Sequence, residues 1–144
     1  MRTTLEVLTV ATLLTLAEGA SAACSVASAK GVWGFSYDSI DLQAQSSCAG
    51  IGLMTFTPAT NLSRSTVKIT AQRESCNGDA AKTFAASGTY TVASICTGKS
   101  TNLKYNSSDP GSKLDFNIVE AGTRLQFILV LSNGVTLRGD AVKR

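Results

Sequence analysis

Residues 113–131 read KLDFNIVEAGTRLQFILVL, and this stretch decides the fold. In its first half, Leu114, Phe116 and Ile118 alternate with polar residues, and the second half repeats the two-residue period. Such a period places apolar side chains on one face of a β-strand. The intervening EAGT at 120–123 is typical of a short glycine turn, so the stretch predicts an antiparallel hairpin.

The same period recurs along the chain, and no segment after residue 22 keeps a helical period over three turns. Turn signals separate the runs; Asn133-Gly134, for example, predicts a two-residue hairpin with positive φ at both positions. Short connections join antiparallel neighbours, and strands without covering helices bury their apolar sides by closing on themselves. We predict an all-β, eight-stranded antiparallel up-and-down barrel, with a Greek-key β-sandwich as the alternative. The expected strands are 32–37, 51–57, 65–72, 82–93, 100–105, 113–120, 124–131 and 135–142.

The first residues are typical of an export signal. Arg2 precedes an apolar run over 7–17, and Ala20 and Ala22 form a small-x-small cleavage pattern. The run is shorter than the ~20 residues that cross a bilayer, so no stable membrane span is expected. We expect a signal peptide at 1–22, cleavage near Ala22, a single β-barrel domain at 23–144, and a secreted, periplasmic or cell-surface location. A lipoprotein form at Cys24 is the alternative, although the usual aliphatic residue before the cysteine is missing.

The charged residues exclude several function classes. The chain has no His, which removes Ser-His-Asp and Cys-His nucleophile pairs and His-ligated zinc. Its 13 Lys and Arg are dispersed, so nucleic-acid binding has little support. We expect no metal and no cofactor, and the sequence leaves the oligomeric state open.

The four cysteines test the topology. An even count in an exported chain indicates two disulfides. In a meander, Cys24 and Cys96 lie at one end of the strands, whereas Cys76 and Cys48, the latter in the loop before the second strand, lie at the other. Strands of about eight to ten residues separate these ends by roughly 25–33 Å, far beyond disulfide reach. The predicted pairs are therefore Cys24–Cys96 and Cys48–Cys76.

Aromatic residues recur at the predicted inward positions. An eight-stranded barrel is just wide enough for side chains or for one small ligand, so these residues either fill the interior or line a cavity. Arg138 either binds an anionic ligand, covers a ring or pairs with a carboxylate across strands. The candidate ligand-binding residues are Trp33, Phe35, Tyr37, Met54, Phe56, Phe84, Tyr90, Phe116, Phe127 and Arg138.

The chain shows no catalytic constellation, and we assign no catalytic residue. Asp38, Asp41 and Asp140 are the only carboxylates expected at a rim, where general acid or base chemistry is conceivable. The other carboxylates lie beside turns or alternate with core residues. No glycine-rich phosphate loop, G-x-S-x-G motif or EF-hand pattern is present.

Four motifs give a resemblance that covers the chain after residue 22: KGxWGF at 30–35, GTYTV with CTG at 88–98, LDFxIV at 114–119 and GTxLxFI at 122–128. They resemble a group of small secreted bacterial proteins of unassigned function, which look like relatives of the eight-stranded calycin-like barrels. That neighbourhood includes allene oxide cyclase, dirigent proteins and lipocalins. The resemblance implies a barrel with Cys24 paired to Cys96, and it carries over no catalytic residue.

Our leading hypothesis is a non-enzymatic exported barrel that binds a small apolar molecule or a cell-surface partner. The first alternative is a cofactor-free cyclase or isomerase of the allene oxide cyclase type, which shapes a reactive substrate in an apolar pocket. It requires a pocket reaching Trp33 or Tyr37 with a buried carboxylate or Arg beside it. The second alternative, a structural or adhesive surface protein, requires an exposed apolar patch. An interior volume of about 300 Å³ or more favours a ligand or substrate.

Overall fold

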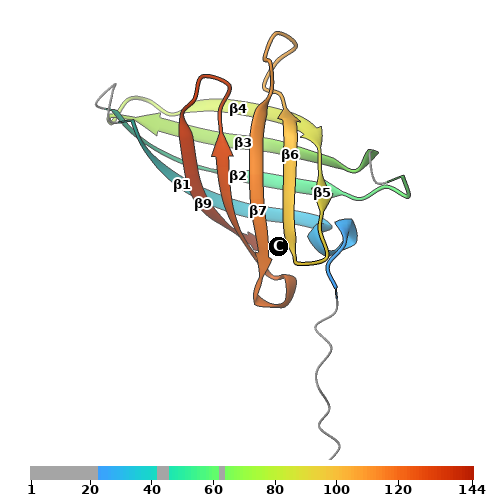
Figure 1. The fold of residues 1–144 in the computed structure, drawn as a ribbon. Coiled ribbons are helices and arrows are strands. Elements are labelled where there is room, and N and C mark those ends of the chain that lie inside the picture. Colours follow the sequence, from blue (N-terminus) through green and yellow to red (C-terminus); the bar gives the residue numbers. More distant parts are fainter. Residues whose placement is uncertain (1–22, 42–45, 62–63) are drawn as a thin grey trace, which may run out of the picture.

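The structure is a computed structural model that describes residues 23–41, 46–61 and 64–144; the predicted signal peptide at 1–22 lies outside the described residues. The strands form one nine-stranded antiparallel sheet in the order β4-β3-β2-β1-β9-β8-β7-β6-β5 (Figure 1). The elements are η1 (Val26–Ala29), β1 (Gly31–Asp41), β2 (Ser46–Thr57), β3 (Thr66–Cys76), β4 (Lys82–Thr89), β5 (Thr91–Val92), β6 (Thr97–Leu103), β7 (Ser112–Val119), η3 (Glu120–Gly122), β8 (Arg124–Val130) and β9 (Thr136–Lys143).

The sheet curls so that its two ends meet. In Figure 1, β1 to β4 cross behind β6 to β9 at a wide angle. Ser87 on β4 and Lys104 after β6 exchange two backbone hydrogen bonds of 3.0 and 2.9 Å. An all-β, antiparallel, barrel-like fold with neighbouring strands in meander order is therefore confirmed. No helical segment in the described part of the chain is long and apolar enough to cross a bilayer.

The predicted count of eight strands is wrong, because the expected strand 82–93 is divided at Tyr90. Its first part, β4, pairs with β3, and its second part, β5, pairs with β6. Tyr90 at the corner donates its backbone N–H to the carbonyl of Ser65 at 2.9 Å. The alternation of side chains continues through the corner, so periodicity alone could not reveal the change of partner.

Both predicted disulfides are present, Cys24–Cys96 and Cys48–Cys76. The expected position of Cys48 in a loop is wrong, because this residue lies within β2, directly opposite Cys76 on β3. The strand begins at Ser46 rather than at residue 51. Its first residues, SSCAG at 46–50, are mostly small residues with weak strand preference, so their composition hid the start of the strand.

The β8–β9 turn also differs from the prediction at Asn133-Gly134. Gly134 has φ of +89°, whereas Asn133 is not among the residues with positive φ. Gly134 N–H donates to Leu131 O at 2.9 Å, and Leu131 N–H donates to Val135 O at 2.8 Å. The connection is thus a three-residue loop in which glycine occupies the left-handed bulge position.

One end of the barrel is filled by side chains and covered by η1. The indole N–H of Trp33 donates to Ala29 O at 2.8 Å, and the Tyr90 hydroxyl donates to Val26 O at 2.8 Å. Phe56 packs against Tyr90 with ring centroids 4.9 Å apart. We call this the closed end; its aromatic side chains fill the interior there rather than line an opening.

Several aromatic rings of the interior lie over glycines of the neighbouring strand. A Cβ atom at Gly98 would stand 2.0 Å from the Phe116 ring, so only glycine leaves room for it. Such pairs let rings cover bare backbone where the sheet bends sharply. The register contains four of them: Phe35–Gly52, Tyr37–Gly50, Phe116–Gly98 and Phe127–Gly139.

Candidate functional site

The end opposite η1 holds a cavity of about 590 Å³, here called the mouth cavity. It lies where β3 ends, β4 and β7 begin, and the β6–β7 and β8–β9 loops project (Figure 1). Its volume falls in the range of small-molecule sites, which starts at about 300 Å³. The lining of the mouth cavity includes Gln72, Glu74, Phe84, Tyr105, Asp109, Ser112, Leu131 and Leu137.

Four of these residues give the mouth cavity an apolar wall. Phe84 and Tyr105 meet edge to face, with ring centroids 6.4 Å apart and planes at 87°. Leu137 is buried and Leu131 is half-buried. A wall of this kind packs against the apolar body of a ligand, while polar groups fix its orientation.

A directed chain of hydrogen bonds runs along the polar side. The Tyr37 hydroxyl donates to Glu74 Oε2 at 2.5 Å, and the Gln72 amide nitrogen donates to the Tyr37 oxygen at 2.9 Å. The Tyr105 hydroxyl donates to Gln72 Oε1 at 3.4 Å. Each donor in the chain therefore points toward the Glu74 carboxylate.

The two carboxylates of the cavity have different surroundings. Asp109 accepts backbone N–H groups from Gly111 at 2.9 Å and from Tyr105 at 3.1 Å, and these bonds hold the pKa of Asp109 below its usual range. Both Asp109 oxygens are thus engaged in shaping the loop. Glu74 uses one oxygen for Tyr37, and its other oxygen lies 3.7 Å from the Cys76 sulfur. Because Cys76 is in a disulfide with Cys48, this cluster offers no thiolate to a metal.

Burial keeps the cavity phenol protonated. Burial and the nearby charge of Glu74 raise the pKa of Tyr105 to about 12. Tyr105 therefore remains a neutral hydroxyl at physiological pH, and its proton is already committed to Gln72. What it offers to the cavity is an oxygen lone pair.

Ser112 supplies the clearest unpaired group. Its side chain is 1% exposed and lies on the inward face of β7, and the residue borders the mouth cavity. Within the described part of the chain, its Oγ is the one buried side-chain polar atom without a hydrogen-bond partner. Buried hydroxyls normally have a partner, and Ser112 Oγ is available to a polar group bound in the cavity.

The structure places the ten residues predicted to bind a ligand in four different surroundings. Phe84 lines the mouth cavity, and Tyr37 reaches its edge through Gln72 and Glu74. Phe35 and Phe127 contact each other in the middle, with ring centroids 5.8 Å apart. Arg138 is exposed on the outer face. The closed end contains Trp33, Met54, Phe56, Tyr90 and Phe116.

Sequence reasoning did not identify Gln72, Glu74, Tyr105 or Ser112 as site residues. The sequence of residues 70–76, TAQRESC, could have identified two of them, Gln72 and Glu74. If Cys76 points inward to form its disulfide, the two-residue period brings Glu74 and Gln72 inward as well.

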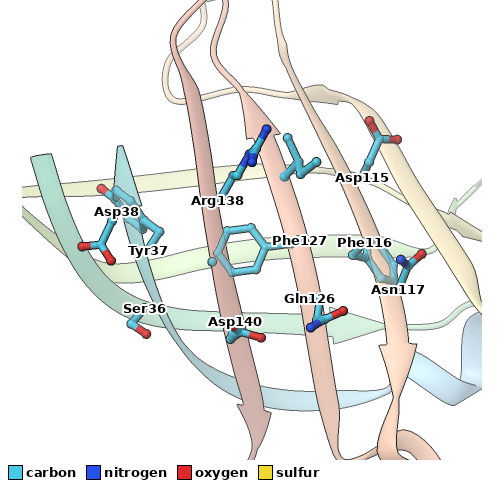
Figure 2. Close-up of a pocket in the computed structure, with 12 residues that line it drawn as sticks. Ser36, Tyr37, Asp38, Asp115, Phe116, Asn117, Gln126, Phe127, Arg138 and Asp140 are labelled. Carbon is cyan, nitrogen blue, oxygen red and sulfur yellow. The ribbon is translucent and has the colours of Figure 1, made fainter. Parts of the chain in front are cut away.

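A second hollow, of about 460 Å³, lies on the outer face of β1, β9, β8 and β7. Figure 2 shows Arg138 and Asp38 on neighbouring strands there, with Asp115 further across the face. Asp140 pairs with Arg124 at 3.0 Å, so this rim carboxylate has a cross-strand partner. The side chain of Asp41 lies outside the described part. This hollow lies on the outer face of the sheet, whereas the mouth cavity lies at the end of the barrel, between strand ends and loops.

No family model matches the chain, and a search of the curated proteins finds no match. Among solved structures, it is similar to the redesigned β-barrel mFAP1 bound to DFHBI, with a TM-score of 0.52, 18% identity, and coverage of 82% of this chain and 97% of that one. Another redesigned β-barrel gives a TM-score of 0.57 at 17% identity, covering 83% and 94%. The barrel mFAP0, also bound to DFHBI, gives 0.50 at 19% identity, covering 81% and 99%. These similarities show the β-barrel fold.

Proposed function

We propose that this chain is an exported protein that binds a small organic molecule in the mouth cavity. The observation that carries the proposal is the difference between the two ends of the barrel. The closed end is filled by aromatic side chains, whereas the mouth holds a 590 Å³ cavity with an apolar wall and an unpaired buried hydroxyl on Ser112. The barrels mFAP0 and mFAP1, which share the fold, are each bound to a small molecule, and this supports the proposal.

Two features support export. Disulfides persist in oxidising compartments, and the described part of the chain contains two of them. Residues 1–22 carry the signal-peptide pattern. Intact-mass analysis of the protein from culture medium and periplasm tests this part: a chain starting near Ala23 is expected, and a cytoplasmic chain that keeps Met1 would contradict it.

Ligand binding is tested by native mass spectrometry and fluorescence against lipids, polyphenols and aromatic amines. Leu131→Trp places a large ring in the mouth, and Asn117→Trp adds the same ring on the outer face. We expect ligands to lose affinity about tenfold or more in Leu131→Trp because the ring occupies their space, and to keep it in Asn117→Trp. The absence of any ligand, or equal binding by both variants, would contradict the proposal.

A cofactor-free isomerase is the second candidate, and one observation favours it. The half-buried Glu74 carboxylate borders the cavity and is hydrogen-bonded to Tyr37, so an acid–base group stands where a bound molecule would lie. Liquid chromatography of each ligand after incubation tests for isomers of unchanged mass. Conversion that disappears in Glu74→Gln supports catalysis, whereas ligands recovered unaltered support binding alone.

An adhesive role has weaker support. The exposed large apolar side chains of the described part are distributed over β1, β2, the β5–β6 turn, β8 and β9. They are Val32, Ile51, Ile95, Ile128 and Val142. Single exposed apolar residues are normal on soluble domains, so they do not by themselves mark an interface.

A further inference from the structure

The Glu74 carboxylate has an oxygen free for a ligand. Oε2 accepts the Tyr37 hydroxyl, whereas the disulfide sulfur of Cys76, 3.7 Å from Oε1, carries no proton to donate. Both ion pairs found in the described part of the chain involve Arg124, so Glu74 has no cation within 4.0 Å there. A half-buried anion without a counterion is costly, and a ligand cation would offset that cost.

The direction of the hydrogen bonds also favours a ligand with hydrogen-bond donors, as a cation has. An ionised Glu74 can only accept, so Tyr37 donates to it and takes the Gln72 amide N–H in return. The Gln72 carbonyl oxygen then faces Tyr105 and accepts a hydrogen bond from the Tyr105 hydroxyl. On this side of the cavity, Glu74 and Tyr105 are therefore left with lone pairs, and this side complements hydrogen-bond donors.

Ser112 gives an independent sign of a polar ligand group. Its Oγ has no partner, its side chain is 1% exposed, and the residue borders the same cavity. A hydroxyl can donate and accept, so an N–H or O–H group of a ligand, or a water carried with it, would satisfy this atom.

We propose that the mouth cavity selects small organic cations, namely a protonated amine or amidine attached to an apolar ring. The cation reaches Glu74 Oε1, and the ring packs on Phe84 and Tyr105, whose π-faces also attract positive charge. No Lys or Arg lines this cavity, whereas the Glu74 and Asp109 carboxylates both do, so an anionic ligand would meet two negative charges in its wall. The inference rests on the proposed binding function and names its ligand class.

Lys82 is the natural competitor for Glu74. It lies opposite Glu74 in the β3–β4 register, so the two side chains share a face, but no ion pair joins them within 4.0 Å. Lys82 is exposed at the start of β4 and can swing toward the carboxylate. Its removal should therefore strengthen cation binding.

Three probes that share a naphthalene ring system and carry a cationic, a neutral or an anionic group test the inference: naphthylmethylamine, naphthalenemethanol and naphthoate, each measured by isothermal titration calorimetry. We expect the amine to bind about tenfold or more tightly than the alcohol, as for hydrogen bonds to charged groups, and the carboxylate to bind most weakly. Glu74→Gln keeps an oxygen for Tyr37 but should abolish the amine preference. Asp115→Asn makes the same charge change on the outer face and should keep it.

The outcomes separate this inference from the proposed function. Equal affinities for amine and alcohol in the native protein, or strongest binding of naphthoate, would overturn cation selectivity and leave ligand binding intact. A lack of any ligand in the broader screen would overturn both. If circular dichroism shows that Glu74→Gln is unfolded, Lys82→Gln decides: tighter amine binding with unchanged alcohol binding supports the inference, and unchanged amine binding overturns it.

Discussion

The Tyr37 phenol reaches Glu74 Oε2 at 2.5 Å by passing over the backbone of Gly50. Tyr37 on β1 is opposite Gly50 on β2, which is opposite Glu74 on β3. A Cβ at Gly50 would lie 2.4 Å from the Tyr37 hydroxyl oxygen, so a missing side chain on β2 allows a contact between β1 and β3. The position of the Glu74 carboxylate at the mouth thus depends on Gly50, which has no side chain.

Tyr37→Phe should destabilise the fold by about 1.5–3 kcal/mol, the usual worth of a hydrogen bond to a charged group. The ring keeps its place, but Glu74 and Gln72 each lose a partner. Tyr105→Phe, which loses only the 3.4 Å bond to Gln72, should cost about 1 kcal/mol or less. Urea unfolding of both variants measures the two costs, and a larger loss in Tyr105→Phe would contradict this order.

Alkaline pH should unfold the protein through its tyrosines. Burial raises the pKa of Tyr90 and Tyr105 to about 12, and burial with the Glu74 hydrogen bond raises the pKa of Tyr37 as well. In the unfolded chain these groups lose their protons near pH 10. The unfolded state therefore binds fewer protons above pH 10, so stability is fully present below that pH and falls as pH rises through 12.

Phenolate absorbance recorded beside urea unfolding between about pH 8 and 12 checks this dependence. We expect phenolate to appear together with unfolding, because these three residues are the only tyrosines in the sequence. A phenolate that forms near pH 10 in the folded protein would contradict the assignment.

The strands that could be predicted are those with uninterrupted alternation. The hairpin read from 113–131 is β7 and β8, Ser112–Val119 and Arg124–Val130, because Leu, Phe and Ile residues occupy every second position on their inward faces. The disulfide pairing followed from the same topology. Strand ends built from small residues, as at 46–50, carry no such pattern and were missed.

Counting forward along β3 from its apolar residues could not find the site, because a bulge changes the phase of the strand. Val67 and Ile69 face inward, and counting onward by two would place Ala71 and Arg73 inward as well. The register instead shifts between Ile69 and Gln72, where Ala71 takes φ of +51°, so Gln72 and then Glu74 face the interior. One extra residue in the bulge thus moves the residues of β3 that follow it from one face of the sheet to the other.

Ser112→Ala should leave the stability of the ligand-free protein unchanged or raise it by up to about 1 kcal/mol, since it removes a buried hydroxyl without a partner. Ser65→Ala is the matched control, because Ser65 is equally buried and its Oγ accepts the Ala59 N–H at 3.0 Å. That variant should lose about 1–2 kcal/mol. Thermal melts compare them; a loss in Ser112→Ala as large as that in Ser65→Ala would show that Oγ has a partner in solution.

Gly50→Ala should cost about 1–3 kcal/mol, because its methyl group would overlap the Tyr37 ring and force it to move. Gly34→Ala is the control: the three atoms nearest its methyl group would all belong to the exposed, flexible side chain of Arg144, so little change is expected. A displaced phenol no longer reaches Glu74, so Tyr37→Phe should cost less in the Gly50→Ala background than in the native one. Chemical denaturation of the two single variants and the double variant measures this coupling. Strictly additive losses would mean that Tyr37 still reaches Glu74 past an alanine, and that Gly50 does not control the contact.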